Sequence, residues 1–355
     1  MKRTVLKNLT LWGKGVDIAI EDGKFVEIGK INEDGEDFGG KRIYPGPIDI
    51  HSHGCLGYEA ISEEDHLLKM AEYMLSQGTT TWYPTTSTAS EQLLAEVANR
   101  RLDYDTGAYM PGFHFEGPYI NPKYKGAQDP LYIKTPNLEF IKSLPKVKRI
   151  SIAPELPGSK NFIENCGILV SLCHTDCDYE TALGAFRAGA TSLTHTYNAM
   201  PGIHHRAPGP IGAASDTEGV YAELICDGHH IHPSAIRILI KIMGTERVIL
   251  ISDSISAMGL PNGHYSSGGL EIDVKDGLCT LENGTIAGST TPLLECMRRA
   301  VKFGCTIEEV FRMGSENPAK LMGLNKGKIE IGYDADYIIT DENLNLLRAV
   351  VGRRM

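Results

Sequence analysis

The chain has 355 residues, of which 42% are hydrophobic and 23% charged, the composition of an ordinary globular protein. Its 35 Lys and Arg residues against 45 Asp and Glu residues give a formal net charge of −10, and no run of five basic residues occurs. This charge excludes a nucleic-acid partner or an anionic membrane surface. No apolar stretch of about 18 residues is present, and the first residues lack the apolar segment of a signal peptide. We therefore expect a cytoplasmic protein without membrane spans.

Short alternating strands open the chain over Val5–Ile28, with a turn at Asp22-Gly23. The same pattern returns over Ile329–Val351, and neither segment shows helical spacing. The two ends therefore predict one small β-sandwich domain, made of residues 1–46 and 325–355. The larger domain would take residues 47–324.

Between the ends, apolar runs typical of buried strands alternate with segments of helical spacing. Eight runs can be counted, at residues 47–53, 79–85, 109–116, 147–153, 168–174, 191–195, 220–226 and 247–253. Two of the helical segments end before Gly78 and Gly189, and Ser90 and Ser234 suit helix starts. Eight parallel strands joined by helices predict an α/β fold, a (β/α)8 TIM-type barrel. The glycine-rich residues 254–288 predict a loop with a hairpin after the eighth strand.

Groups able to bind a metal or transfer a proton stand at the ends of five predicted strands. They are His51 and His53 on the first, Glu116 on the third, His174 on the fifth, His195 on the sixth and Asp253 on the eighth. Each residue alone is more often a hydrogen-bonded structural group, but five together at the catalytic end of a barrel indicate a metal site. Imidazole and carboxylate ligands suit zinc, iron or similar divalent ions, with one position open for water.

Two of these segments carry more specific expectations. Side chains alternate along a strand, so His51 and His53 are predicted to point to the same side and to reach one metal. Asp253 follows the apolar run Val248–Ser252, and its carboxylate could take a proton from a metal-activated water and pass it to a leaving group. The alternative role for Asp253 is the N-cap of the next helix.

The eight cysteines are too sparse for a disulfide framework and are predicted to be reduced. Cys173, His174 and Cys177 could suggest a zinc knuckle, but no second cysteine pair has matching spacing. We expect the side chain of Cys173 to point away from His174.

Four short segments resemble a known family. They are His114-Phe115-Glu116-Gly117-Pro118, Thr194-His195-Thr196-Tyr197-Asn198-Ala199-Met200, Asp227-Gly228-His229-His230 and Ser252-Asp253. They look like the hallmark stretches of the N-acetylglucosamine-6-phosphate deacetylases of the amidohydrolase superfamily, and the resemblance runs nearly end to end. It implies hydrolysis of the acetamide of N-acetyl-D-glucosamine 6-phosphate to D-glucosamine 6-phosphate and acetate, in amino-sugar catabolism.

The resemblance also implies roles for individual residues. Glu116, His174 and His195 match the primary metal ligands, Asp253 matches the catalytic acid-base residue, and His230 matches a histidine that polarises the amide carbonyl or holds the sugar. The phosphate would meet Asn198, Ala199 and Arg206. Further substrate-binding positions are Ala127, Gln128, Asp227, Ile286, Ala287 and Gly288. Arginine and backbone N–H groups suit phosphate.

The same resemblance implies a divalent ion, with zinc first and iron, manganese, cobalt or cadmium as alternatives. Some relatives use one metal, whereas His51 and His53 would allow a second. Arg206 would reach the active site of a neighbouring subunit, which implies a homodimer. Gln128 departs from the family pattern, in which histidine is common at this position.

Three other functions remain open from the sequence. The chain could act on the galactosamine epimer, or it could be another amidohydrolase, such as a cyclic-amide hydrolase or a deaminase, because a barrel alone does not choose a reaction. A non-catalytic barrel subunit would be expected to lack some of the ligands, and Glu116, His174, His195 and Asp253 are all present.

Overall fold

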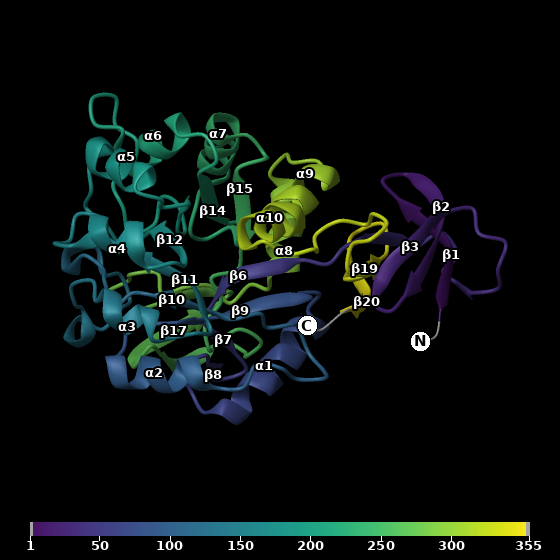
Figure 1. Ribbon diagram of the computed structural model, residues 1–355, viewed down its shortest axis with the longest axis horizontal. Coiled ribbons are helices and arrows are strands. Elements are labelled where there is room, and N and C mark those ends of the chain that lie inside the picture. Colours follow the sequence, from purple (N-terminus) through teal and green to yellow (C-terminus); the bar gives the residue numbers. More distant parts are fainter. Residues whose placement is uncertain (1–2, 353–355) are drawn as a thin grey trace.

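The computed structural model describes residues 3–352, so the first two and last three residues of the predicted terminal domain lie outside this range. Its larger part is a barrel of eight parallel strands surrounded by helices (Figure 1). The strands are β6 (Ile48–Ser52), β9 (Thr81–Thr86), β10 (Phe113–Glu116), β11 (Val147–Ile152), β12 (Leu169–Leu172), β13 (Ser192–Leu193), β14 (Tyr221–Ile225) and β15 (Val248–Ile251). All eight predicted runs are confirmed, and the fold is a TIM-type barrel.

The sheet order follows the chain from β6 to β15, and every neighbouring pair is parallel. The first and last strands meet where the backbone N–H of Asp253 donates to the carbonyl of His51 at 3.0 Å. The hydroxyls of Ser52 and Ser254 are also 2.7 Å apart. The barrel is therefore nearly closed, and its first and eighth strands share one end of the site described below.

Helices connect consecutive strands and cover the outside of the barrel. They are α1 (Glu64–Ser76), α2 (Glu91–Asn99), α3 (Leu138–Lys142), α4 (Ser159–Asn165), α5 (Tyr179–Arg187), α6 (Gly209–Asp216), α7 (Pro233–Met243), α8 (Leu293–Lys302), α9 (Ile307–Phe311) and α10 (Asn317–Met322). The short turns η1 (Pro122–Tyr124), η2 (Pro130–Tyr132) and η3 (Arg312–Glu316) complete the helical elements. Helix and strand side chains pack into one large apolar core.

Helix starts agree with the sequence in one of two cases. The Ser90 side chain accepts a hydrogen bond from the Leu93 N–H and caps α2, as expected. The start at Ser234 is wrong, because α7 begins one residue earlier, at Pro233, and its cap is the His232 side chain. Proline suits the first helical position, where its missing N–H would have no partner in the helix.

Strands from both ends of the chain form a second, seven-stranded sheet beside the barrel (Figure 1). They are β1 (Thr4–Leu11), β2 (Lys14–Glu21), β3 (Lys24–Gly29), β4 (Glu36–Asp37), β5 (Arg42–Pro45), β19 (Tyr337–Thr340) and β20 (Leu346–Val350). β5 joins the two ends, because it pairs with β19 on one side and β1 on the other. Alternating residues pack into apolar clusters on both faces, one around Leu6 and Ile18 and one around Val5 and Ala19.

Two smaller sheets complete the fold. β7 (Gly54–Cys55) pairs with β8 (Tyr58–Glu59), directly after the first barrel strand. After the eighth strand, β16 (Gly263–Ser267), β17 (Leu270–Lys275) and β18 (Leu278–Thr280) form an antiparallel sheet, which confirms the predicted loop with a hairpin.

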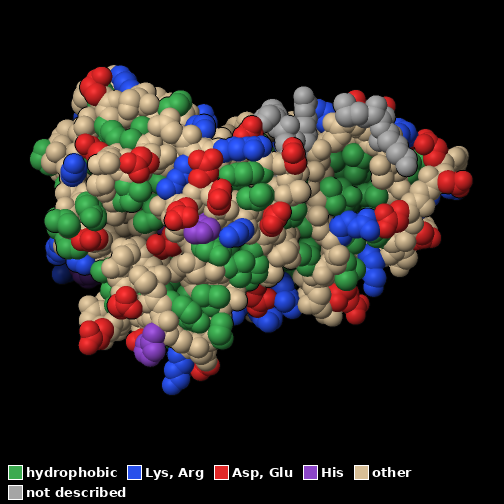
Figure 2. Space-filling view, turned by 90° about the horizontal axis from the view of Figure 1, so that it is seen from below, with side chains coloured by type: hydrophobic (Ala, Val, Ile, Leu, Met, Phe, Trp, Pro, Cys, Tyr) green, Lys and Arg blue, Asp and Glu red, His purple; other side chains and the backbone are tan. Residues whose placement is uncertain are grey.

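The helices and one face of the surface can be described by their apolar character and charge. Within residues 3–352, no helix has the length and apolar character needed to cross a bilayer. On the face shown in Figure 2, Lys and Arg side chains lie among Asp and Glu side chains, without a broad basic area.

Candidate metal centre and active site

The predicted metal-binding side chains come together at the carboxyl ends of the barrel strands. Three of them lie just beyond a strand, in the left-handed backbone region: His174 (φ 43°), His195 (φ 28°) and Asp253 (φ 49°). Residues other than glycine seldom adopt this conformation, which costs of order 1–3 kcal/mol and is concentrated at functional sites. The chain therefore turns sharply just after each of these strands, and the residue at the turn contributes its side chain to the site.

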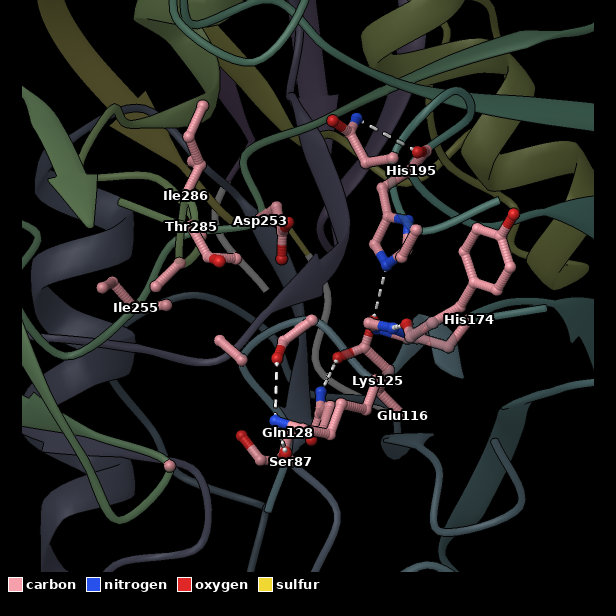
Figure 3. Close-up of a pocket in the computed structure, with 18 of the residues that line it drawn as sticks. Ser87, Glu116, Lys125, Gln128, His174, His195, Asp253, Ile255, Thr285 and Ile286 are labelled. Atoms are coloured by element: carbon pink, nitrogen blue, oxygen red, sulfur yellow. Dashed lines mark hydrogen bonds and ion pairs between the residues drawn. The ribbon is translucent and has the colours of Figure 1, made fainter. Parts of the chain in front are cut away.

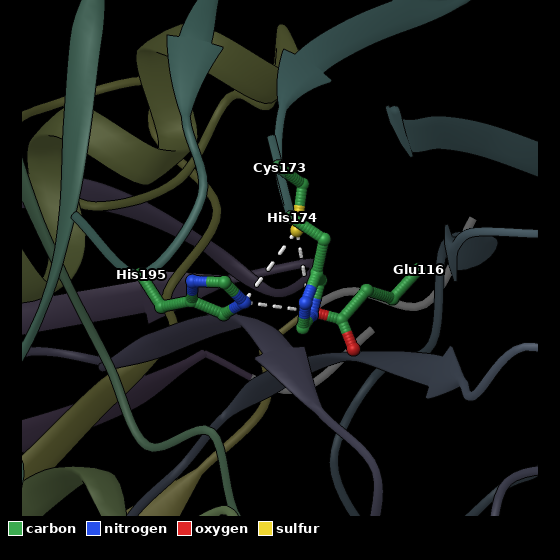
Figure 4. A group of neighbouring side chains, drawn as sticks. All are labelled: Glu116, Cys173, His174 and His195. Carbon is green, nitrogen blue, oxygen red and sulfur yellow. Dashed lines mark hydrogen bonds and ion pairs between the residues drawn. The ribbon is translucent and has the colours of Figure 1, made fainter. Parts of the chain in front are cut away.

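Glu116 is the centre of a first cluster, which we call the primary group: Glu116, Cys173, His174 and His195 (Figure 4). Its Oε1 atom lies 2.9 Å from His195 Nε2 and 3.3 Å from His174 Nε2. The donor atoms of the four residues lie within 4.8 Å of one another, and all four residues are buried. Two imidazoles, one carboxylate and one thiol thus converge on one small volume.

A second group shares Glu116 and consists of His51, His53 and Glu116. The two imidazole Nε2 atoms lie 3.3 Å apart, so both rings are on one side of the strand end. His53 Nε2 is also 3.3 Å from Glu116 Oε2. Asp253 Oδ1 lies 3.3 Å from His51 Nε2 and 3.4 Å from His53 Nε2, which places Asp253 at the second group.

Hydrogen bonds from the far side of two rings set which nitrogen faces the site. His174 Nδ1 lies 2.7 Å from the carbonyl oxygen of Tyr124, and His51 Nδ1 lies 3.1 Å from Glu223 Oε2. Because these oxygens only accept, each Nδ1 carries a proton, and Nε2 is the nitrogen that faces the centre and is left to bind a metal. This arrangement is the usual support of a metal-ligating histidine.

Electrostatic coupling between the buried groups shifts their pKa values strongly. Burial raises the pKa of Glu116, but the neighbouring imidazoles, His51 first, hold it well below its usual range. Burial lowers the pKa of His53, but Asp253 and Glu116 raise it to about 10. His195 behaves in the same way, and its pKa rises to about 9 mainly through Glu116. Without a bound cation, protonated imidazoles therefore balance the negative charge of the ionised carboxylates.

The expectation that Cys173 points away from His174 is wrong. Its Sγ atom lies 3.5 Å from Glu116 Oε1 and 3.5 Å from His195 Nε2, inside the primary group. The strand β12 ends at Leu172, and the left-handed backbone at His174 breaks the alternation on which the expectation rested. Cys177, the other thiol of the alternative zinc knuckle, is absent from the primary group.

A cavity of about 580 Å³ opens above the two groups. Figure 3 shows Asp253 and Ile286 on one side of it and Glu116 and His174 on the other. Most of the predicted substrate-binding residues line it: Ala127, Gln128, Asn198, Ala199, His230, Ile286, Ala287 and Gly288. Gln128 spans the cavity wall, because its amide donates to Glu116 Oε2 at 2.5 Å and accepts from the Thr88 N–H at 2.7 Å.

Two predicted substrate contacts lie outside the cavity, and the backbone N–H of a third already has a partner. Asp227 does not line the cavity but holds His230, since its Oδ2 lies 2.7 Å from His230 Nδ1. Arg206 is exposed, outside the cavity, and its guanidinium contacts the ring of His205. The backbone N–H of Asn198 donates to the carbonyl of His195 at 2.9 Å and is therefore already used within the chain.

Comparison with known proteins agrees with this geometry. The chain matches the amidohydrolase family over residues 42–353. The chain belongs to the amidohydrolase family. Its relatives include an N-acetylglucosamine-6-phosphate deacetylase of Lysinibacillus sphaericus, 33% identical over 99% of this chain and 97% of the relative. An N-acetylgalactosamine-6-phosphate deacetylase of Escherichia coli O157:H7 is 31% identical over 94% of this chain and 93% of its own.

A solved structure of similar shape is that of an N-acetyl-D-glucosamine-6-phosphate deacetylase variant from Mycobacterium smegmatis, in complex with N-acetyl-D-glucosamine-6-phosphate. It is 27% identical, with a TM-score of 0.93, and the alignment covers 100% of this chain and 99% of that one. The small β domain at the termini is therefore part of the shared architecture and not an addition to this amidohydrolase.

Amidohydrolases generally use a divalent metal, and the residues of this amidohydrolase fit one. Two ligands of one tetrahedral ion, each bonded at about 2.0–2.1 Å, lie roughly 3.3–3.4 Å apart. The distances of 3.3 Å from Glu116 Oε1 to His174 Nε2, and between the Nε2 atoms of His51 and His53, match this value. Buried nitrogen and oxygen donors that face one another at such distances suit a cation. A bound cation would take over the role of the protons that balance the carboxylate charge in its absence.

Sequence reasoning about this amidohydrolase missed two charged residues beneath the centre. Glu223 lies in the apolar run Val220–Cys226, and Arg149 lies in Val147–Ala153. Glu223 is the single charged residue of its run, and Arg149 alternates with the apolar residues that its strand buries, next to the exposed Lys148. A charged residue at a buried strand position is a signal that could have found them, because such residues are almost never fully buried unless paired. The structure pairs them with each other.

Proposed function

We propose that this chain removes the acetyl group of N-acetyl-D-glucosamine 6-phosphate by hydrolysis, giving D-glucosamine 6-phosphate and acetate in amino-sugar catabolism. The observation that carries the proposal is the coincidence of two features at one end of the barrel. A cluster of buried ligands lies at the floor of the cavity, and Asn198, Ala199 and His230 of the family motifs line its wall. Curated relatives that this chain matches over most of their length are N-acetylglucosamine-6-phosphate deacetylases.

The cation that we propose at the primary group is zinc, held by Glu116, His174 and His195. When bound, it would supply Lewis-acid chemistry, which polarises an amide carbonyl and makes water a nucleophile near neutral pH. His51 and His53 would hold a second ion with Glu116. Support comes from the mixed imidazole and carboxylate donors, which also suit iron, manganese, cobalt or cadmium.

Asp253 is the residue to which we assign proton transfer. Its carboxylate projects into the cavity, and Glu116 and His174 lie across from it (Figure 3). Its pKa is lowered despite burial by the nearby imidazoles, His51 first, so it is ionised and able to accept a proton. It would take one proton from the attacking water as the C–O bond forms, and give that proton to the amine nitrogen as the C–N bond breaks.

His230 is assigned to the carbonyl or sugar side of the substrate. Asp227 occupies Nδ1 of the ring, which leaves Nε2 as the nitrogen available to the cavity. Burial raises the pKa of Asp227, but His230 and the backbone N–H groups around it lower that pKa far below its usual range. The ionised carboxylate thus orients the ring, and as an imidazolium the ring would donate a hydrogen bond from Nε2 to an oxygen that gains negative charge.

The phosphate end of the substrate requires a cation, and we assign Arg206 of a second copy of the chain. Arg206 is exposed and lies away from the cavity of its own chain, so an assembly would be needed to bring it to a substrate. The proposal therefore includes a homodimer. The cytoplasmic location also remains part of it, and the eight free cysteines support a reducing compartment.

The galactosamine epimer is a second candidate substrate, because a deacetylase of that epimer is 31% identical over 94% of this chain. The two sugars differ at one hydroxyl, and the residues that line the cavity do not separate them by charge. A comparison of kcat/KM for both 6-phosphates decides between them.

The deciding experiment measures acetate release together with the metal content of the purified protein, before and after chelation. We expect acetate release from the glucosamine substrate to disappear with the bound ion and to return when zinc is restored. A protein that holds metal but releases no acetate from either epimer would refute the substrate and leave the metal centre intact.

A further inference from the structure

A buried ion pair lies inside the barrel, beneath the two groups of metal ligands. It joins Arg149 of β11 and Glu223 of β14, both 0% exposed. Strands β12 and β13 separate these two strands in the sheet, so the pair crosses the interior of the barrel. Barrel interiors are filled mainly by branched apolar side chains. Burial of two charges carries a desolvation cost that an apolar pair would avoid. Packing alone therefore does not explain why this ion pair lies in the barrel.

Glu223 contacts two of the candidate ligand residues through one oxygen. Its Oε2 lies 3.1 Å from His51 Nδ1 and accepts a hydrogen bond from the His195 backbone N–H at 3.2 Å. Arg149 contacts the other oxygen, Oε1, and also donates to the Ser192 hydroxyl at 3.2 Å. Both oxygens of the carboxylate therefore have partners, Oε1 in Arg149 and Oε2 in the His195 N–H and the His51 ring.

The consequence for His51 is a defined tautomer. With its Nδ1 proton directed to Glu223, Nε2 is the ring nitrogen that faces Glu116 Oε1 at 3.4 Å and Asp253 Oδ1 at 3.3 Å. A carboxylate in this position also makes the other ring nitrogen a better donor to a metal. His174 of the primary group does not depend on Glu223, because the Tyr124 carbonyl orients its ring.

We propose that Glu223, held by Arg149, is a positioning residue that fixes His51 as an Nε2 donor and so controls whether an ion binds at the second group. The inference rests on the proposed metal centre but not on the identity of the sugar. Metal binding can be measured without substrate, so failure of the proposed reaction and failure of this inference are distinguishable.

The test replaces Glu223 and counts the ions that bind. Zinc is titrated into metal-free wild type, Glu223→Gln and the pair Arg149→Met with Glu223→Gln, which avoids an unpaired buried arginine. We expect two ions per wild-type chain. In both variants the first ion should bind with unchanged affinity, and the second about 10- to 100-fold more weakly. Ser171→Ala is the control, because this buried hydroxyl contacts Ser192 and Thr194 but no ligand side chain.

A double-mutant cycle separates positioning from a general structural role. His51→Asn alone should weaken the binding of the second ion measurably, and adding Glu223→Gln should lower that affinity no further, because Glu223 acts through His51. Three results would overturn the proposal: one ion in the wild type, two ions bound normally by a merely less stable Glu223→Gln variant, or additive losses in the double variant.

Discussion

Asp253 lies at the meeting point of the second group and the cavity, where one carboxylate can serve both water and leaving group. We expect Asp253→Asn to lower kcat by about 10²- to 10⁴-fold, the usual contribution of a general acid-base residue, while the affinity for substrate changes little. Steady-state kinetics and equilibrium substrate binding measure the two effects.

The matched control is Asp276→Asn in the turn between β17 and β18. Asp276 also has a left-handed backbone (φ 52°), but it is exposed and its carboxylate accepts from the Asn262 side chain. Near-normal turnover in Asp253→Asn would remove Asp253 from the mechanism. Equal losses in both variants would point to misfolding.

Proton release on metal binding follows from the raised pKa values of His53 (about 10) and His195 (about 9). At pH 7.5 both rings are protonated in the metal-free protein, and an ion must displace those protons, so the affinity for metal should rise with pH up to about 9–10. Calorimetry in two buffers of different ionisation enthalpy should detect about two protons released per chain. His53→Asn should release one fewer, and zero release would contradict the assignment.

The same pKa shifts determine whether the stability of the metal-free protein rises or falls with pH. The pKa values of His53 and His195 in the folded chain lie above the ordinary value near 6.5. Their contribution is fully present below about pH 6.5 and is lost as the pH rises through 9–10. The melting temperature of the metal-free protein should therefore fall between pH 7 and pH 10. A rise over this range would contradict the shifts.

At the scale of residues, the sequence predicted which side chains gather at the candidate metal centre better than it predicted the residues that support them. Histidines and carboxylates at strand ends are visible because strand periodicity and the barrel rule place them. Cys173 was misplaced because alternation was extended past the end of β12. The partnership of Arg149 and Glu223 depends on contacts across the barrel that no local pattern records.

At the scale of elements, glycines and capping residues mark the boundaries well. Helix α1 ends before Gly78 and α5 before Gly189, as the sequence predicts, since both glycines have the positive φ that ends a helix at no steric cost. Strand ends are less visible, because the left-handed turns at His174, His195 and Asp253 occur without glycine, and histidine and aspartate only occasionally adopt this conformation. The position of these turns decides which side chain enters the site.

The loop after β18 packs against the backbone of Asp253, and a substitution there tests whether this close packing is needed for activity. Gly288 has φ +66°, and a Cβ atom there would lie 2.4 Å from Ile255 Cγ2 and 3.1 Å from the Asp253 carbonyl oxygen. We expect Gly288→Ala to displace the backbone behind Asp253 and to reduce kcat/KM at least tenfold, which is about 1.4 kcal/mol.

Gly284→Ala is the matched control for this substitution. Gly284 has φ +81° in the same loop, but nothing lies within 4 Å of its added Cβ atom. Both variants should lose roughly 1 kcal/mol of stability from backbone strain, and only Gly288→Ala should lose activity. Equal kinetics for the two variants would show that the loop is not held against Asp253.

At the scale of the whole molecule, the proposed dimer makes Arg206 a residue of the neighbouring site. Arg206→Ala should raise KM for the 6-phosphate far more than for the phosphate-free sugar, because the guanidinium would meet only the phosphate. Gel filtration should give the mass of a dimer.

Mixed dimers show whether the contact crosses between subunits. Arg206→Ala and Asp253→Asn chains, each weak alone, should recover about a quarter of wild-type activity after exchange, since half of the dimers are mixed and each has one complete site. Absence of recovery despite proven exchange would place Arg206 at the site of its own chain or at none.

The overall architecture could be predicted from the sequence because eight apolar runs and two strand-rich ends leave few alternatives. The exact boundaries at residues 46/47 and 324/325 stay a prediction. Pairing within the terminal sheet could not be foreseen, since β5 joins β1 and β19 through contacts between opposite ends of the chain. Assembly between chains is likewise invisible to local patterns.

Closure of the barrel also determines when, during folding, the candidate site is completed. His51 and Asp253 come from the first and eighth strands, and the neighbouring hydroxyls of Ser52 and Ser254, 202 residues apart in sequence, meet only when the barrel closes. During synthesis, the ribosome must release the eighth strand before the first can find its last partner. Contacts of such long range form slowly, so the hydrolytic machinery is completed at the end of folding. A nascent or truncated chain would thus be unable to act on the sugar, even with the primary ligands already made.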